Sequence, residues 1–177
     1  MFSMEILKLH WICGDADDPD DPCLHGRVRV RIGDDLVDSG ETFWAVSAGA
    51  LRMLESLFED HVPGQEAHLL PCCGHFMLIN EDTGELLILG CSNGVDWGVF
   101  HERGEVRLVT QGGTEARMPY QAYRATILRF AEAIEAFYAA STPKTPPGED
   151  WQRRAYEAFW AKWRALKARA KGEEQAP

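Results

Sequence analysis

The sequence predicts an α+β fold in a single domain, with one antiparallel β-sheet of five to seven strands and helices packed on it. Three observations support this fold class. Apolar and basic residues alternate strictly across residues 27–32, which is the period of a half-buried strand. Apolar residues recur at helical spacing across residues 119–140. Four apolar segments in the middle of the chain are separated only by short turns, as in an antiparallel meander.

The first third of the chain contains three predicted strands and one predicted helix. We expect the strands at residues 4–12, 27–32 and 42–46. Residues 14–22 include two prolines and five aspartates, so we expect an irregular loop there. A helix is predicted over residues 47–61. Ser47 is its expected N-cap, because a serine hydroxyl can accept a hydrogen bond from a free backbone N–H in the first turn.

The remaining elements are four strands and two helices. The strands are predicted at residues 68–80, 85–90, 95–101 and 105–110, with turns that contain Gly or Asn between them. The helices at 47–61 and 119–140 should cover one face of the sheet. A last helix over residues 149–170 carries a broad aromatic arc, and we expect it to brace the core from the C-terminal side.

The chain divides into four parts. Residues 1–141 form the predicted α+β core domain, 142–148 a proline-rich linker, 149–171 an amphipathic helix packed on the core, and 172–177 a disordered tail. The net charge is −12 over residues 1–148 and +2 over residues 149–177. Two interpretations of the last helix therefore remain open. It docks on the acidic body of its own chain, or it docks on a partner or a second copy, which would give a homodimer.

The overall composition indicates which cellular compartment and which class of partner we expect. The chain has 18 basic and 28 acidic residues, for a formal net charge of −10, which disfavours nucleic acid as the partner. No apolar run approaches the ~20 residues of a membrane span. The first residues lack the features of a signal peptide, so we expect a cytoplasmic protein. In that reducing compartment the five cysteines would remain thiols.

Two short motifs could form a metal site, because each places a thiol and an imidazole two residues apart: Cys23-Leu24-His25 and Cys73-Gly74-His75. On a strand, residues two apart face the same way. Two such strands meeting would present Cys23, His25, Cys73 and His75 as a tetrahedral zinc set. Under the alternative interpretation the cysteines fill the core as small apolar side chains, and no cofactor is expected.

Two sets of residues form a candidate interaction surface. Arg27, Arg29 and Arg31 recur at roughly 7 Å on one face of a strand, where they could bind an acidic peptide or a phosphate. The alternative is a solvent-exposed face whose arginines pair with neighbouring acids. The second set comprises tryptophans of the last helix, Trp151, Trp160 and Trp163.

Five segments, taken in order, resemble a set of small stand-alone bacterial proteins that are uncharacterised: His10-Trp11, Asp21-x-Cys23-x-His25-Gly26, Leu70-Pro71-Cys72-Cys73-Gly74-His75, Gly94-Val95-Asp96-Trp97 and Phe159-Trp160-x-x-Trp163. The resemblance covers nearly the whole chain and implies a bacterial cytosolic protein. It assigns no activity and no catalytic residue. In size and charge alone, the chain is also similar to immunity proteins of bacterial toxin systems.

From these observations we expect a non-enzymatic protein-binding module. Its acidic body would attract a basic partner, and buried aromatic side chains would hold the complex. An immunity-type inhibitor is one specific form of this function, and a second copy of the chain is another partner to consider. The alternative is a zinc-binding protein or a metal-dependent enzyme that uses the Cys/His cluster. The sequence lacks a phosphate-binding glycine loop, a dinucleotide fingerprint and a His-Glu-x-x-His motif. The absence of these motifs favours a non-enzymatic protein but does not exclude an enzyme.

Overall fold

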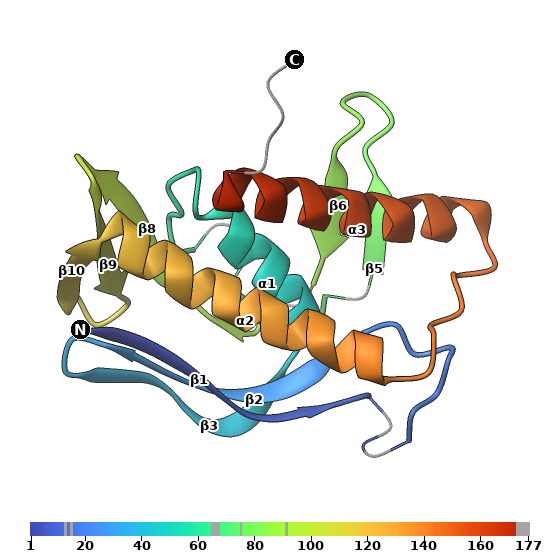
Figure 1. Cartoon of the computed structure of the whole chain (residues 1–177), viewed down its shortest axis with the longest axis horizontal. Coiled ribbons are helices and arrows are strands. Elements are labelled where there is room, and N and C mark those ends of the chain that lie inside the picture. The colour runs from blue at the N-terminus through green and yellow to red at the C-terminus, as the bar shows by residue number, and fades with distance from the viewer. Residues whose placement is uncertain (13, 15, 65–67, 75, 91, 173–177) are drawn as a thin grey trace.

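A computed structural model describes residues 1–12, 14, 16–64, 68–74, 76–90 and 92–172. Within these ranges the chain forms three helices and four small antiparallel sheets (Figure 1). The predicted mixture of helices and antiparallel strands is confirmed. The prediction of one sheet of five to seven strands is wrong, because the strands are divided among sheets of three, three, two and two.

The first sheet is formed by β1 (Phe2–His10), β2 (His25–Ile32) and β3 (Asp35–Trp44), in the order β1-β2-β3. The alternation predicted for β2 is present in the burial of its side chains. Val28, Val30 and Ile32 are fully buried, and the arginines between them lie on the opposite face. In Figure 1, α2 (Tyr120–Ala140) lies across this sheet.

Helix α1 (Val46–Glu55) begins directly after β3, and the prediction that Ser47 caps it is wrong. Ala45 is the N-cap residue, and its backbone N–H donates to the carbonyl of Pro71 over 2.9 Å. Ser47 is buried inside the first turn, with its hydroxyl 3.5 Å from the carbonyl of Leu24. The strand therefore runs straight into the helix, and the start of the helix is held by contacts with other segments.

The other sheets come from the middle of the chain. A second three-stranded sheet has the order β10-β9-β8 and consists of β8 (Trp97–Glu102), β9 (Glu105–Thr110) and β10 (Glu115–Pro119). The sequence analysis did not predict β10. Short strands β4 (Leu70–Pro71) and β7 (Gly94–Val95) pair with each other, and β5 (Phe76–Ile79) and β6 (Leu86–Leu89) form a separate hairpin.

Asp96 explains part of this division, because it interrupts the extended segment between β7 and β8. Its carboxylate Oδ1 accepts a hydrogen bond from the backbone N–H of Leu69 over 3.1 Å and lies 2.7 Å from Nε2 of His61. On one side of this buried side chain the segment pairs with β4, and on the other it pairs with β9. A continuous strand would have joined the two sheets.

Helix α3 (Asp150–Lys171) packs on α1, α2 and β5, and it runs in the opposite direction to α2 (Figure 1). Phe159 and Trp163 enter the core from its inner face. Three of its lysines pair with glutamates of the two other helices: Lys162 with Glu55, Lys167 with Glu135, and Lys171 with Glu132. The basic helix is therefore docked on the acidic body of its own chain.

Candidate functional site

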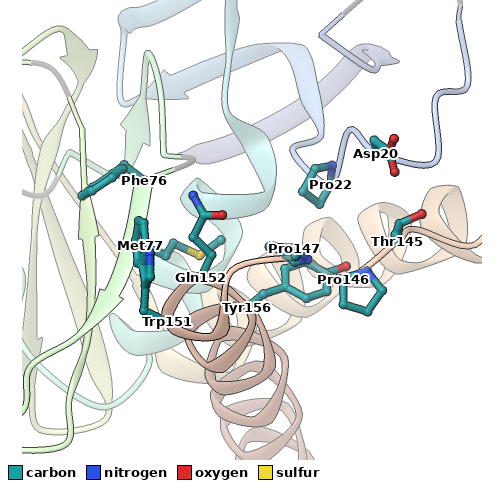
Figure 2. A pocket seen from close by; sticks show the side chains of 11 residues that line it. Asp20, Pro22, Phe76, Met77, Thr145, Pro146, Pro147, Trp151, Gln152 and Tyr156 are labelled. Atoms are coloured by element: carbon teal, nitrogen blue, oxygen red, sulfur yellow. The ribbon is translucent and has the colours of Figure 1, made fainter.

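A groove with a volume of about 470 Å³ lies where the proline-rich linker and the start of α3 face β5 (Figure 2). The other wall comes from residues 20 and 22 of the aspartate-rich loop, which we call the aspartate loop (residues 14–22). Rings and apolar side chains make up most of the lining: Pro22, Phe76, Met77, Pro146, Pro147, Trp151 and Tyr156. We refer to this site as the aromatic groove.

Two aromatic side chains of the groove remain in contact with water. Phe76 is 51% exposed and Trp151 is 38% exposed. Their ring centroids are 5.5 Å apart and the rings are tilted, so the two side chains form one apolar surface. Exposed apolar patches bordered by polar groups mark interaction sites, and tryptophan and tyrosine contribute much of the binding energy at protein interfaces. The aromatic groove has this composition.

The apolar surface continues on the β5–β6 hairpin, none of whose eight residues is fully buried. Met77 and Ile88 form a cross-strand pair that packs against the core. Because side chains alternate between the two faces of a strand, Ile79 and Leu86 share the face of Met77 and Ile88, and the other two pairs lie on the opposite face. These pairs are Phe76 with Leu89 and Leu78 with Leu87, and we call their four side chains the outer hairpin face.

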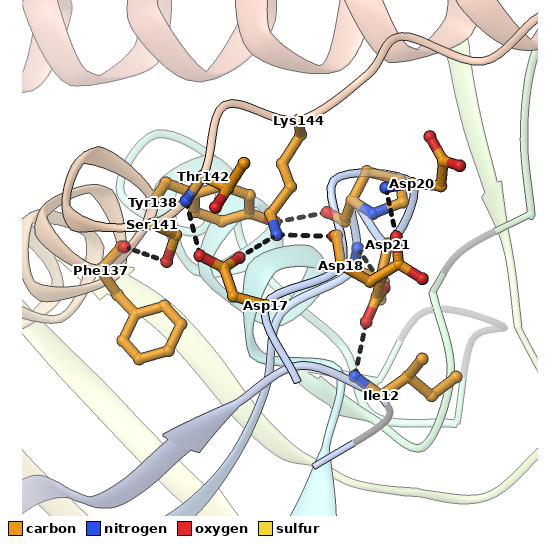
Figure 3. A network of polar contacts seen from close by, with 12 residues as sticks. Ile12, Asp17, Asp18, Asp20, Asp21, Phe137, Tyr138, Ser141, Thr142 and Lys144 are labelled. Carbon is orange, nitrogen blue, oxygen red and sulfur yellow. Dashed lines mark hydrogen bonds and ion pairs between the residues drawn. The ribbon is translucent and has the colours of Figure 1, made fainter. Parts of the chain in front are cut away.

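Lys144 ties the linker wall of the groove to the aspartate loop (Figure 3). Its Nζ donates to Asp17 Oδ1 over 2.7 Å and to the carbonyl of Asp18 over 2.9 Å. It also lies 3.4 Å from the centroid of the Trp11 ring, a cation–π contact. The hydrogen bonds from Lys144 and from the backbone N–H of Thr142 lower the pKa of Asp17 to about 2. Asp17 is therefore ionised at neutral pH, and we call its ion pair with Lys144 the lysine clamp.

The aspartate loop is also fixed from within. Asp21 is buried and its carboxylate accepts backbone hydrogen bonds from Ile12 over 2.6 Å and from Cys23 over 3.1 Å. The hydroxyl of Tyr138, on α2, donates to the carbonyl of Pro22 over 2.6 Å. The linker and the aspartate loop, which form two sides of the groove, are consequently held in place before any ligand arrives.

Asp20 differs from Asp17 of the same loop, whose carboxylate pairs with Lys144. Its backbone N–H donates to Asp18 Oδ1 over 2.9 Å, which fixes its position. Its carboxylate is exposed at the edge of the groove and pairs with no basic side chain in the described part of the chain. With Thr145 and Gln152, it supplies the polar groups of the lining. The groove is thus apolar inside and acidic at one edge.

The predicted zinc ligands are only partly placed by the structure. Cys23 is buried, and burial raises the pKa of its thiol to about 12, which opposes formation of a thiolate. His25 begins β2, with Nδ1 3.2 Å from the carbonyl of Cys23, and Cys73 is half-buried after β4. His75 lies outside the described residues. Across the ranges described above, no group of three or more His, Cys, Asp or Glu side chains could hold a metal ion. The zinc site therefore stays a prediction.

The arginines lie on the outer face of the first sheet, away from the aromatic groove. Arg27 donates to the carbonyl of Gly40 over 2.7 Å, and Arg29 pairs with Glu5 at 2.9 Å. Arg31 is exposed and has no partner among the residues that the structure describes. The structure does not bring these side chains together with the tryptophans of α3.

The three tryptophans occupy different environments. Trp151 lines the aromatic groove. Trp160 is half-buried, and its ring packs edge-on against Tyr138 with a centroid distance of 5.0 Å. Trp163 is fully buried and donates from Nε1 to Glu135 over 2.6 Å. Trp163 is therefore a core residue of the folded chain and presents no surface to a partner.

Sequence reasoning missed most of the groove. Residues 142–148 were interpreted only as a linker, although three prolines and a lysine in seven residues are also the composition of a stiff, structured wall. The signal for the outer hairpin face was present in the sequence, because β5 and β6 are apolar at every position rather than at alternate ones. A two-stranded hairpin cannot bury both of its faces against a single layer.

Comparison with known proteins gives no relatives: no protein family, no curated protein and no solved structure matches the chain. Among the described residues, no helix is both long enough and apolar enough to cross a membrane.

Proposed function

We propose that this chain is a non-enzymatic protein-binding module that holds a partner protein in the aromatic groove and on the outer hairpin face. One observation carries the proposal. Phe76 and Trp151, two large aromatic side chains in ring contact, remain 51% and 38% exposed beside a groove whose linker and aspartate loop are joined by the lysine clamp. Side chains and loops that are already fixed lose little conformational entropy on binding, so more of the free energy of apolar contact is retained as affinity.

The charge of the chain favours a basic partner. The net charge of −10 would accelerate association with a positively charged protein, and Asp20 places one of these negative charges at the groove itself. An acidic inhibitor of a basic protein, as in immunity systems, is the specific form of this function that the charge favours.

A second copy of the chain fits the surface less well. If two hairpins paired edge to edge in an antiparallel way, the tip of each would approach the base of the other. The tip carries Glu81, Asp82 and Glu85, and the base lines the same groove as Asp20. This arrangement would place like charges together, which costs free energy in an interface.

Two exposed phenylalanines provide a matched test. Phe76 belongs to the proposed site, whereas Phe43 is 42% exposed on the first sheet, away from the groove. Wild type, Phe76→Ser and Phe43→Ser would each be expressed in the source organism at equal levels, and the proteins that co-purify would be quantified. We expect a specific partner to be lost from Phe76→Ser and retained by Phe43→Ser. Retention by both variants, or loss from Phe43→Ser alone, would contradict the proposal.

A further inference from the structure

We infer that the segment held in the aromatic groove is an extended, proline-containing stretch of the partner that carries a lysine or arginine. This inference rests on the proposed protein-binding function and specifies the chemistry of its ligand. Three features of the groove support it: the nature of its walls, the way in which the chain already holds its own proline-rich segment, and the unpaired carboxylate of Asp20.

The proline wall favours a ligand that needs little backbone pairing on that side. Pro146 and Pro147 have no backbone N–H, so this wall cannot offer the ladder of hydrogen bonds that an added β-strand requires. A polyproline II segment has no internal hydrogen bonds, and its prolines have no N–H to satisfy. It presents rings and carbonyls, which match the rings of the groove and the N–H donors of Trp151 and Gln152.

The chain itself contains an example of the proposed contact. The linker is a proline-rich segment with one lysine, and that lysine lies between the carboxylate of Asp17 in the aspartate loop and the ring of Trp11, which precedes the loop. Lys144 Nζ lies 2.7 Å from Asp17 Oδ1 and 3.4 Å from the centroid of Trp11. The backbone N–H of Thr145 donates to the carbonyl of Pro19 over 2.8 Å, so the segment is also held through its main chain.

The groove also carries a carboxylate and an indole ring, which lie towards opposite ends of it (Figure 2). Asp20 supplies a carboxylate without a basic partner in the described ranges, and Trp151 supplies a half-exposed indole ring. A basic side chain on the ligand would meet Asp20 while neighbouring prolines lie against Trp151 and Pro147. A neutral ligand would forgo the ion pair with Asp20 and an acidic ligand would meet a like charge, so a basic ligand is favoured by the modest free energy of one exposed ion pair.

Peptide selection tests this directly. A phage-displayed library of random peptides would be selected against the wild-type chain and against Trp151→Ala, and only peptides that require Trp151 would be analysed. We expect these peptides to be enriched in proline, with a lysine or arginine near the prolines. Peptides that require Trp151 but lack proline or a basic residue would overturn this inference and leave protein binding through the groove intact. If no selected peptide requires Trp151, both the inference and the proposed function fail.

The affinity of the selected peptide gives the second readout. Fluorescence anisotropy at low salt should show binding about threefold to fivefold weaker for Asp20→Asn, the effect of one exposed ion pair. Asp34→Asn is the matched control, because Asp34 is an exposed aspartate in the turn between β2 and β3. Its affinity should equal that of the wild type. Equal affinities for all three proteins would show that Asp20 does not meet the basic residue.

Discussion

Substitutions at two tryptophans of α3 should have different effects, one mainly on stability and the other mainly on binding. Trp163 is fully buried, packs against Phe159 with a ring-centroid distance of 5.9 Å, and donates a hydrogen bond to Glu135. Trp151 lies on the first turn of the same helix and is 38% exposed in the groove. Replacing each in turn by alanine removes the same atoms from the two environments.

The expected loss of stability differs between the two variants. Burying a tryptophan side chain removes about 200 Å² of its surface from water. At about 25 cal/mol per Å², the upper limit of the resulting hydrophobic stabilisation is about 5 kcal/mol. Core truncations of this size cost about 3–5 kcal/mol, so we expect a decrease of about 4 kcal/mol in the free energy of unfolding for Trp163→Ala. At Trp151 water fills the vacated space and alanine has the better helix propensity, so we expect a decrease of about 1 kcal/mol.

Urea unfolding followed by circular dichroism measures both values, with the midpoint and the slope fitted separately. The slopes should match that of the wild type, because neither change alters the surface exposed on unfolding by much. Equal losses for the two variants would refute the assignment of one tryptophan to the core and the other to the groove. A loss below about 2 kcal/mol for Trp163→Ala would show that α3 is not packed on the body of the chain.

Three further outcomes follow from single sites. The hydrogen bond from Lys144 lowers the pKa of Asp17 from 3.8 to about 2, so its contribution to stability is complete above pH 3.8 and is lost as the pH falls towards 2. Urea titrations over that range should show a weaker pH dependence for Asp17→Asn. Burial raises the pKa of Cys23 to about 12, so iodoacetamide at pH 8 should leave Cys23 unmodified in the folded chain and label it after denaturation, as read by mass spectrometry. Gly49→Ala should lower the melting temperature although alanine favours helices, because the added Cβ would lie 2.7 Å from the carbonyl oxygen of Leu69.

Local periodicity was enough to predict the elements with the clearest patterns. The alternation in β2 and the helical spacing in α2 each reflect one buried face, and the structure shows both. The docking of α3 could be anticipated from its charge, because lysines such as Lys167 pair with glutamates of the acidic body. These patterns depend on neighbours in sequence, which is why a single sequence reveals them.

The division into four sheets depends on contacts between distant residues, which no local pattern contains. Asp96 meets His61 and Leu69 across 35 and 27 positions in the sequence, and this contact interrupts a segment that reads as one strand. The aromatic groove also depends on contacts between residues that are distant in the sequence. Its walls are joined by Lys144 and Asp17, 127 residues apart. The sequence suggested the tryptophans of α3 as a candidate interaction surface but could not place Trp151 beside β5.

Site-specific photo-cross-linking in the source organism tests the central claim most directly. A photoreactive residue would replace, one at a time, Gln152 in the groove, Leu87 on the outer hairpin face, Arg31 on the first sheet and Arg117 on the second. If the aromatic groove and the outer hairpin face hold a partner protein, positions 152 and 87 should give the same adduct, and positions 31 and 117 should give none of it. An adduct that forms mainly at position 31 or 117 would place the partner on a sheet face and contradict the account.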